Sequence, residues 1–258
     1  MQTKIWKSHL RAIFWVVILS NALFASVTRS DVKLLEASED IKLISQQIAK
    51  EYFYFSKFPH KKDSQKKLYQ TLSFLDERLR LIASTTKSED TKDLLSFLSL
   101  SREEIESTLT KKYSQENSTL MLDYSDILLE GAISIANDHR YNFSQEEKML
   151  IRIKHFSFLI ERMSKYYFAY QSGFRDQNTI KRLHATIKDF ETVLNQINSY
   201  RYGGEVAKNL ESINAYWAVV KKFYLEFNKR DVPNIVYIST DYLKTVITSL
   251  ELYHSKNL

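Results

Sequence analysis

Two stretches of this sequence decide its fold: ISQQIAKEYF at residues 44–53 and LIERMSKYYF at residues 159–168. The second stretch begins 115 positions after the first. The same offset, without a gap, pairs Ser125-Asp126 with Thr240-Asp241. Because self-similarity at a fixed spacing is the sequence signature of a repeated structural unit, this offset predicts two copies of one module.

Turn-forming positions recur at the same offset as the apolar ones. Ser88 corresponds to Gly203, and the polar stretch 114–117 corresponds to 229–232. The chain holds only 4 Gly and 2 Pro, so it has little of the punctuation that many short strands need. Long helices joined at these recurring turns are therefore expected.

Apolar residues within each copy follow the helical period. Between 68 and 82 they recur every three or four positions, which places them on one buried face of a helix. These residues are Leu68, Leu72, Leu75, Leu79 and Ile82. The same pattern predicts eight helices at 30–57, 64–85, 90–113, 118–138, 144–171, 177–200, 204–229 and 233–255.

Helix starts carry recognisable signals. Asp63-Ser64 and Asn178-Thr179 are residue types whose side-chain oxygens cap free backbone amides. Ser144 and Glu147 have the spacing of a capping box, and Pro233 suits the first turn of the last helix. We expect the second copy to begin at Ser144.

Short connections make neighbouring helices antiparallel. The predicted fold is therefore all-α, with two tandem up-down-up-down four-helix bundles at 30–140 and 143–257. An N-terminal segment, 1–25, stands apart from both.

The N-terminal segment has the features of a signal peptide. Lys4, Lys7 and Arg11 precede the apolar run 12–25, which at fourteen residues is shorter than the roughly 20 that span a bilayer. Cleavage after Ala25 is one expectation, and an uncleaved inner-membrane anchor is the alternative. Both export the remainder of the chain, so we predict a periplasmic location.

The composition limits the classes of function to be considered for this chain. The net charge is +6, but the leader carries three of the basic residues, and without it 34 basic against 31 acidic residues leave only +3. That value is too small to indicate a nucleic-acid partner. The chain has no cysteine, its six histidines form no H-x-x-x-H or H-E-x-x-H pair, and Gly203-Gly204 lacks the spacing of a phosphate loop. We therefore expect no enzyme, no metal and no cofactor.

Residues 42–50, KLISQQIAK, resemble the RMLSQRMAK signature that opens the PilJ-type domain. That domain is named for the N-terminal part of type IV pili methyl-accepting chemotaxis transducers, and it is similar to the NarX-like sensor domain of nitrate and nitrite kinases. Gln47 departs from the family arginine. In the second copy Arg162, Met163 and Lys165 match the signature, whereas Glu161 replaces its glutamine.

The resemblance implies a periplasmic four-helix bundle that senses a solute. In the nitrate sensors an anion binds where the first helices of two subunits meet, with an arginine from each. The matching positions here hold Lys42 and Ser157, and lysine cannot reproduce the bidentate fork of arginine, so nitrate is not the expected ligand. The candidate ligand-binding residues are Lys42, Gln46, Gln47, Lys50, Arg162 and Lys165.

These candidates allow two structural interpretations. If the two copies pack face to face, Gln47 and Lys50 on one helix and Arg162 and Lys165 on the other could enclose a polar pocket. The alternative is a polar stripe, solvated or between helices, with no ligand. The aromatic runs 52–55 and 166–170 likewise suit either ligand stacking or core packing.

Two functions follow from these interpretations. The first is an exported sensor-like protein without its own signalling output, which binds a small solute or anion and acts through a membrane partner. The second is a periplasmic structural or interaction protein that presents helical faces to another envelope protein. A homodimer is a further option for either.

Overall fold

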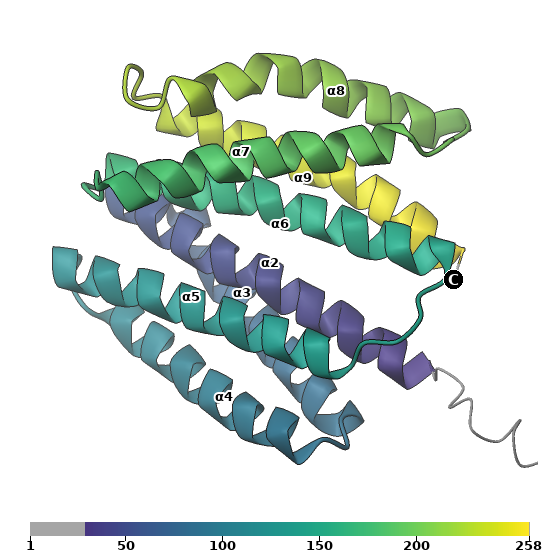
Figure 1. Ribbon diagram of the computed structural model, residues 1–258. Coiled ribbons are helices and arrows are strands. Elements are labelled where there is room, and N and C mark those ends of the chain that lie inside the picture. Colours follow the sequence, from purple (N-terminus) through teal and green to yellow (C-terminus); the bar gives the residue numbers. More distant parts are fainter. Residues whose placement is uncertain (1–28, 258) are drawn as a thin grey trace, which may run out of the picture.

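The structure, a computed structural model, describes residues 29–257, and within that range every regular element is a helix (Figure 1). The predicted all-α class is confirmed. The elements are α2 (Arg29–Lys57), α3 (Lys62–Thr85), α4 (Glu89–Thr110), α5 (Gln115–Asp138), α6 (Gln145–Gln171), α7 (Gln177–Asn198), α8 (Gly204–Leu225) and α9 (Pro233–Lys256).

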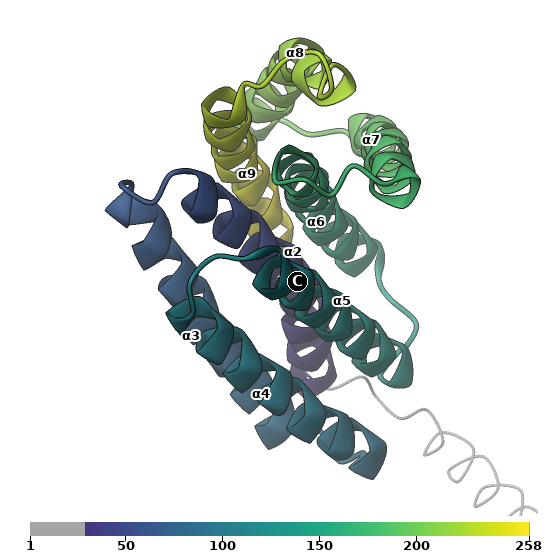
Figure 2. The same ribbon diagram turned by 90° about the vertical axis from the view of Figure 1, so that its left-hand side faces the viewer.

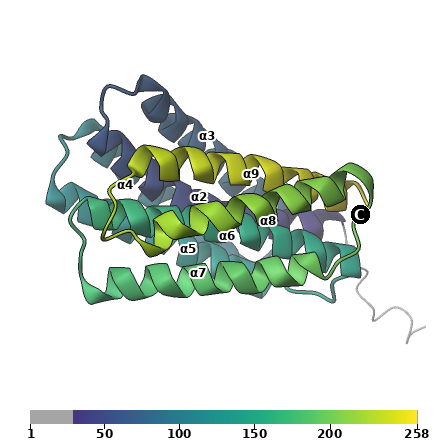
Figure 3. The same cartoon turned by 90° about the horizontal axis from the view of Figure 1, so that it is seen from above.

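The helices pack as a bundle around two central members, α2 and α6, which contact each other (Figure 2). In the first half of the chain, α2 contacts α3 and α5, and α4 contacts α5 and α3. In the second half, α6 contacts α7 and α9, and α8 contacts α9 and α7. Seen from above, α8 lies between α9 and α7 (Figure 3). The pattern of contacts in one half thus repeats in the other.

Helix boundaries follow the offset of 115 residues closely. Gln177, the first residue of α7, lies 115 positions after Lys62, the first residue of α3, and Gly204 of α8 lies 115 positions after Glu89 of α4. The α5 start is three residues earlier than predicted, because the Ser114 side chain accepts a hydrogen bond from the Asn117 amide.

Two of the predicted helix-start signals are confirmed, and the residues predicted to cap the other two helices are wrong. Ser144 and Glu147 form the predicted capping box, and Pro233 opens α9. The cap of α7 is Asp176, whose carboxylate accepts from the amides of Asn178 and Thr179, so those two residues are inside the helix. The cap position of α3 is Lys61, which makes no side-chain capping bond.

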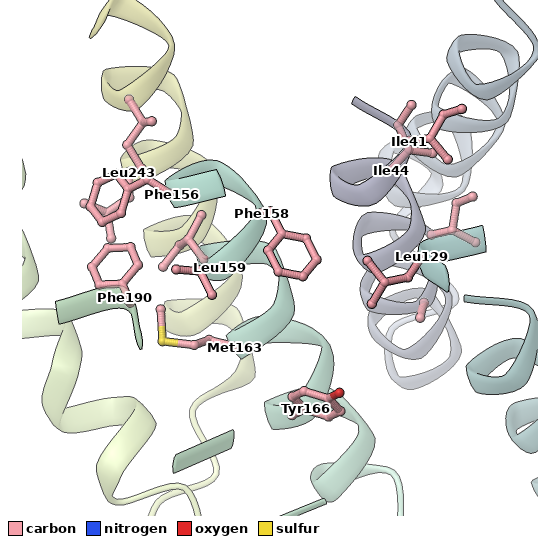
Figure 4. Close-up of a cluster of buried hydrophobic side chains, with 14 of the residues drawn as sticks. Ile41, Ile44, Leu129, Phe156, Phe158, Leu159, Met163, Tyr166, Phe190 and Leu243 are labelled. Carbon is pink, nitrogen blue, oxygen red and sulfur yellow. The ribbon is translucent and has the colours of Figure 1, made fainter. Parts of the chain in front are cut away.

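The core cluster extends along α2 from Leu34 to Tyr54 and along α6 from Ile153 to Ala169, and Figure 4 shows part of it. All five apolar residues of the predicted 68–82 stripe are buried. Tyr52, Phe53 and Tyr54 are buried as well, as are the residues from Tyr166 to Ala169. The Phe156 and Phe190 rings stack with centroids 4.2 Å apart, which ties α6 to α7. Both aromatic runs therefore pack within the protein core.

The predicted leader, residues 1–25, lies outside the described residues. Among the described helices, none combines the length and the hydropathy needed to cross a membrane.

Substituting Ser144→Ala tests the start of the second half. The Ser144 hydroxyl accepts from the Glu147 amide at 3.1 Å, and the Glu147 carboxylate accepts from the Ser144 amide at 2.6 Å. Losing such a cap costs about 1 kcal/mol of unfolding free energy, measured by urea denaturation. Ser96→Ala, at an exposed position inside α4, is the matched control and should change stability by less than about 0.5 kcal/mol. Equal losses in the two variants would contradict the capping role.

Candidate functional site

A buried lysine of α2 joins the two halves of the chain. Lys50 is 0% exposed, and its ammonium lies 2.8 Å from Glu161 of α6, 3.1 Å from Glu51 and 3.5 Å from Asp241 of α9. A buried charge must be compensated by oppositely charged groups, because removing an ion from water costs several kcal/mol. The three carboxylates provide that compensation.

Two further lysines complete this group. Lys67 of α3 contacts Asp241 at 2.5 Å, and Lys244 of α9 contacts Glu161 at 3.2 Å. We call the set the closed cluster; it contains Lys50, Glu51, Lys67, Glu161, Asp241 and Lys244. It holds three cations and three carboxylates, so its formal charges cancel.

Burial and the neighbouring charges shift the pKa of Glu161 in opposite directions. Burial alone would raise the pKa of its carboxyl, but Lys50 and Lys244 outweigh that effect and lower the pKa from 4.5 to about 2. The pKa of Lys50 is raised despite burial, because Glu161, Glu51 and Asp241 stabilise its charged form. Glu161 and Lys50 are therefore both charged at neutral pH.

A second group of charges lies on the α5 and α7 side of α6. The Lys165 ammonium is 0% exposed and lies 2.9 Å from Asp126 of α5. Arg182 of α7 contacts the same carboxylate at 3.0 Å and donates to the Tyr166 hydroxyl at 3.4 Å. Arg162 lies beside them, with its guanidinium 5.7 Å from the Tyr166 ring centre. We call Arg162, Lys165, Tyr166, Arg182 and Asp126 the open cluster, and we include the buried Gln46 because it lies 115 positions before Glu161 of the closed cluster.

Five of the six members of each cluster correspond through the offset of 115; the exceptions are Lys244 and Arg162, whose corresponding residues are Leu129 and Gln47. Lys50 corresponds to Lys165, and Asp241 to Asp126. The contacts are reciprocal, because Lys50 of the first half reaches Asp241 of the second, while Lys165 of the second half reaches Asp126 of the first. Lys67 and Arg182 also correspond, and each contacts the aspartate of its own cluster.

The clusters differ in their charge balance. The counterparts of the buried Glu51 and Glu161 are Tyr166 and Gln46, which carry no negative charge at neutral pH. The open cluster therefore holds three cations and one carboxylate. Burial favours a raised pKa for Tyr166, yet Lys165, Arg162 and Arg182 lower it. This cluster has an excess of positive charge that its own side chains do not cancel.

Two buried polar atoms of the open cluster are available for a hydrogen bond. The buried Nε of Arg162 and the buried Oε1 of Gln46 have no hydrogen-bond partner among the described residues. Arg162 forms no ion pair within that part of the chain either. Asp126 and Arg182 are partly exposed, with side-chain values of 36% and 42%, so the cluster is accessible from solvent on their side.

The candidate residues predicted from the sequence separate into three places. Lys50 is in the closed cluster, and Gln47 accepts a hydrogen bond from its Lys244. Arg162, Lys165 and Gln46 are in the open cluster. Lys42 belongs to neither, because its ammonium pairs with Glu39 on the same helix at 2.6 Å.

The facing helices do meet, but carboxylates fill the space around Lys50. Those acidic residues were not predicted from the sequence, and neither were Lys67 and Arg182. The sequence did mark the two aspartates, since Ser125-Asp126 and Thr240-Asp241 correspond at the offset of 115. Helical periodicity, however, does not tell which charged side chain faces inward.

Two histidines at the far end of the bundle were also missed. His139 follows α5, and His254, its counterpart at the offset, is buried near the end of α9. His139 Nε2 lies 3.1 Å from the Thr91 hydroxyl, and His254 Nε2 lies 2.8 Å from the Tyr202 hydroxyl. Each therefore ties the last helix of its half to the region where the second and third helices connect.

Comparison with known protein families, curated proteins and solved structures finds no match for this chain. No group of three or more His, Cys, Asp or Glu among the described residues is arranged to hold a metal ion. The resemblance to the PilJ-type domain stays a prediction.

Replacing Glu161 with Gln tests the closed cluster. The depressed pKa means that ionised Glu161 contributes stability above about pH 4.5, and that this contribution is lost as the pH falls toward about 2. Glu161→Gln should lower the unfolding free energy by about 3 kcal/mol at pH 7. Chemical denaturation across this range should show a smaller loss on acidification in the variant than in the wild type.

Glu103→Gln, at an exposed position of α4, is the matched control. It should leave the pH profile unchanged. A Glu161→Gln profile parallel to the wild-type profile would contradict the charge assignment.

Proposed function

We propose that this chain is an exported, non-enzymatic binding protein that takes up a small anion at the open cluster and acts through a membrane partner. The observation that carries the proposal is the charge imbalance between two corresponding clusters. Where the closed cluster has two buried carboxylates, the open cluster has a phenol and an amide. A bound anion would restore the missing negative charge.

The chemistry of the open cluster suits a small oxyanion or carboxylate. Guanidinium groups bind such anions through charge-assisted hydrogen bonds, and Arg162 and Arg182 supply two of them. Lys165 adds a point charge that the protein has already desolvated. Partial burial strengthens these interactions, since the surroundings screen charge less than bulk water does.

We further propose that the fold consists of two tandem antiparallel four-helix bundles derived from one duplicated module. Three observations support it: the repeated pattern of helix contacts, the helix starts 115 residues apart, and the reciprocal Lys50–Asp241 and Lys165–Asp126 contacts. On this proposal the α2–α6 contact within one chain takes the place of the subunit contact that the resembled sensors use. The predicted leader is the basis for a periplasmic location.

An interaction protein is the second candidate, and an exposed surface favours it. Ile235, Ile238 and Tyr242 have the spacing of one helical face on α9 and are 45%, 63% and 44% exposed. Apolar side chains grouped on a helix face are typical of surfaces that another helix covers. This surface could serve the membrane partner of the first candidate equally well.

Anion binding can be tested by calorimetry and thermal unfolding of residues 26–258 with acetate, nitrate, phosphate and sulfate at constant ionic strength. We expect at least one of these anions to stabilise the protein at millimolar concentration. Arg162→Gln should weaken that binding on the order of tenfold, because it removes a charged donor. Arg80→Gln, at an exposed position of α3, is the matched control and should leave binding unchanged.

A second variant supplies the missing charge within the chain. Gln46→Glu places a carboxylate at the counterpart of Glu161, so it should abolish the response to anions while leaving the helical content unchanged. A wild-type protein that no anion stabilises would contradict the proposal, as would anion binding that survives both Arg162→Gln and Gln46→Glu. Either result would favour the interaction protein.

A further inference from the structure

A second basic site lies on α6, toward its start and away from the open cluster. It is a cavity of about 300 Å³ between α6, α7 and the segment before α6. Lys148, Arg152 and His155 line it and recur at helical spacing along α6. This volume is at the lower end of the range for small-molecule pockets.

The cations of this cavity have no acidic partners. Neither Lys148 nor Arg152 forms an ion pair with any described residue, and the one hydrogen bond of the Arg152 side chain goes to the Met149 sulfur at 3.1 Å. Two carboxylates act on His155. Glu39 already pairs with Lys42, and Asp189 is exposed on α7.

Three apolar side chains and Gln196 form the rest of the lining. Phe143, Ile151 and Val193 contribute carbon surface beside the cationic groups. Burial lowers the pKa of His155, and with that shift its ring is neutral at pH 7, available as a hydrogen-bonding group beside the charged Lys148 and Arg152. The cavity therefore combines positive charge on one side with an apolar wall on the other.

The corresponding place in the first half is occupied by an ion pair. The residues 115 positions before His155 and Val193 are Asp40 and Arg78, and their side chains lie 3.5 Å apart. In the second half, valine replaces the long arginine and histidine replaces the aspartate. One change removes bulk and a positive charge and the other removes a negative charge, so an internal ion pair is replaced by space and uncharged lining beside Lys148 and Arg152.

We propose that this cavity binds an organic monocarboxylate with a small aromatic or branched apolar body. The carboxylate contacts Arg152 and Lys148, and the apolar body lies against Phe143, Ile151 and Val193. Such a ligand uses both parts of the lining, whereas an inorganic anion uses only the cations. The lining of this site shares no residue with the open cluster, although the charge of Arg162 acts on His155.

The test uses 4-fluorobenzoate as the probe and residues 26–258 as the protein, with ¹⁹F NMR and calorimetry as readouts. We expect saturable binding that is tighter than that of acetate. Arg152→Gln should weaken binding on the order of tenfold through the lost charged contact. Val193→Phe should weaken it at least as much, because the larger ring fills the cavity without changing the charge.

Two control variants distinguish binding in this cavity from binding at surface lysines or at the open cluster. Lys188→Gln removes an exposed lysine of α7 that lines no part of the cavity, and Arg162→Gln removes a cation of the open cluster. Lys188→Gln should bind 4-fluorobenzoate like the wild type, and Arg162→Gln should lose only binding at the open cluster while keeping the binding that Arg152→Gln weakens. Circular dichroism checks that Val193→Phe is folded. Because Arg152 is half-buried, Arg152→Gln is less disruptive to folding than Val193→Phe.

Three results would overturn the proposal. They are no saturable binding by the wild type, wild-type affinity in both Arg152→Gln and Val193→Phe, or a loss of affinity in Arg162→Gln as large as in Arg152→Gln. The last result would place the probe at the open cluster, whereas the first two leave small-anion binding there unaffected.

Discussion

The contact between α2 and α6 is the constraint on which the rest of the structure depends. Each helix is buried over most of its length, and each places a fully buried lysine where the halves meet. Lys50 and Lys165 can be there only because carboxylates from the opposite half reach them, since an uncompensated buried charge costs several kcal/mol. The positions of α9 and α5, which carry Asp241 and Asp126, are therefore tied to the central pair.

The two clusters share this arrangement but differ in charge. The closed cluster adds Glu51 and Glu161 and is neutral, which suits a structural role. The open cluster has Tyr166 and Gln46 at those positions and keeps a positive excess beside partly exposed side chains. The cavity at Arg152 shows the same kind of change, because the Asp40–Arg78 pair of the first half has no counterpart there. In both places, carboxylates present at one position of the offset are missing at the corresponding position: Glu51 and Glu161 are matched by Tyr166 and Gln46, and Asp40 is matched by His155.

Much of the fold was predictable because it is determined locally. The periodicity at 68–82 and the capping box at Ser144–Glu147 depend on neighbours along the chain, and helix positions followed within a few residues. Site residues on the motif helices, such as Lys50 and Lys165, were found because a pattern marks them. Their acidic partners were not, because Asp241 lies 191 residues from Lys50 and only the packing of helices brings them together. The caps of α3 and α7 were misplaced because several polar residues in succession offer equivalent cap positions.

The most direct test of anion binding at the open cluster is anomalous diffraction from crystals of residues 26–258 soaked in selenate, a small oxyanion with a strong anomalous signal. We expect a selenium peak among the side chains of Arg162, Lys165 and Arg182, with no peak at Lys50, where Glu51, Glu161 and Asp241 already surround the charge. If the crystal binds selenate elsewhere but shows no selenium peak at the open cluster, the proposed anion site is contradicted.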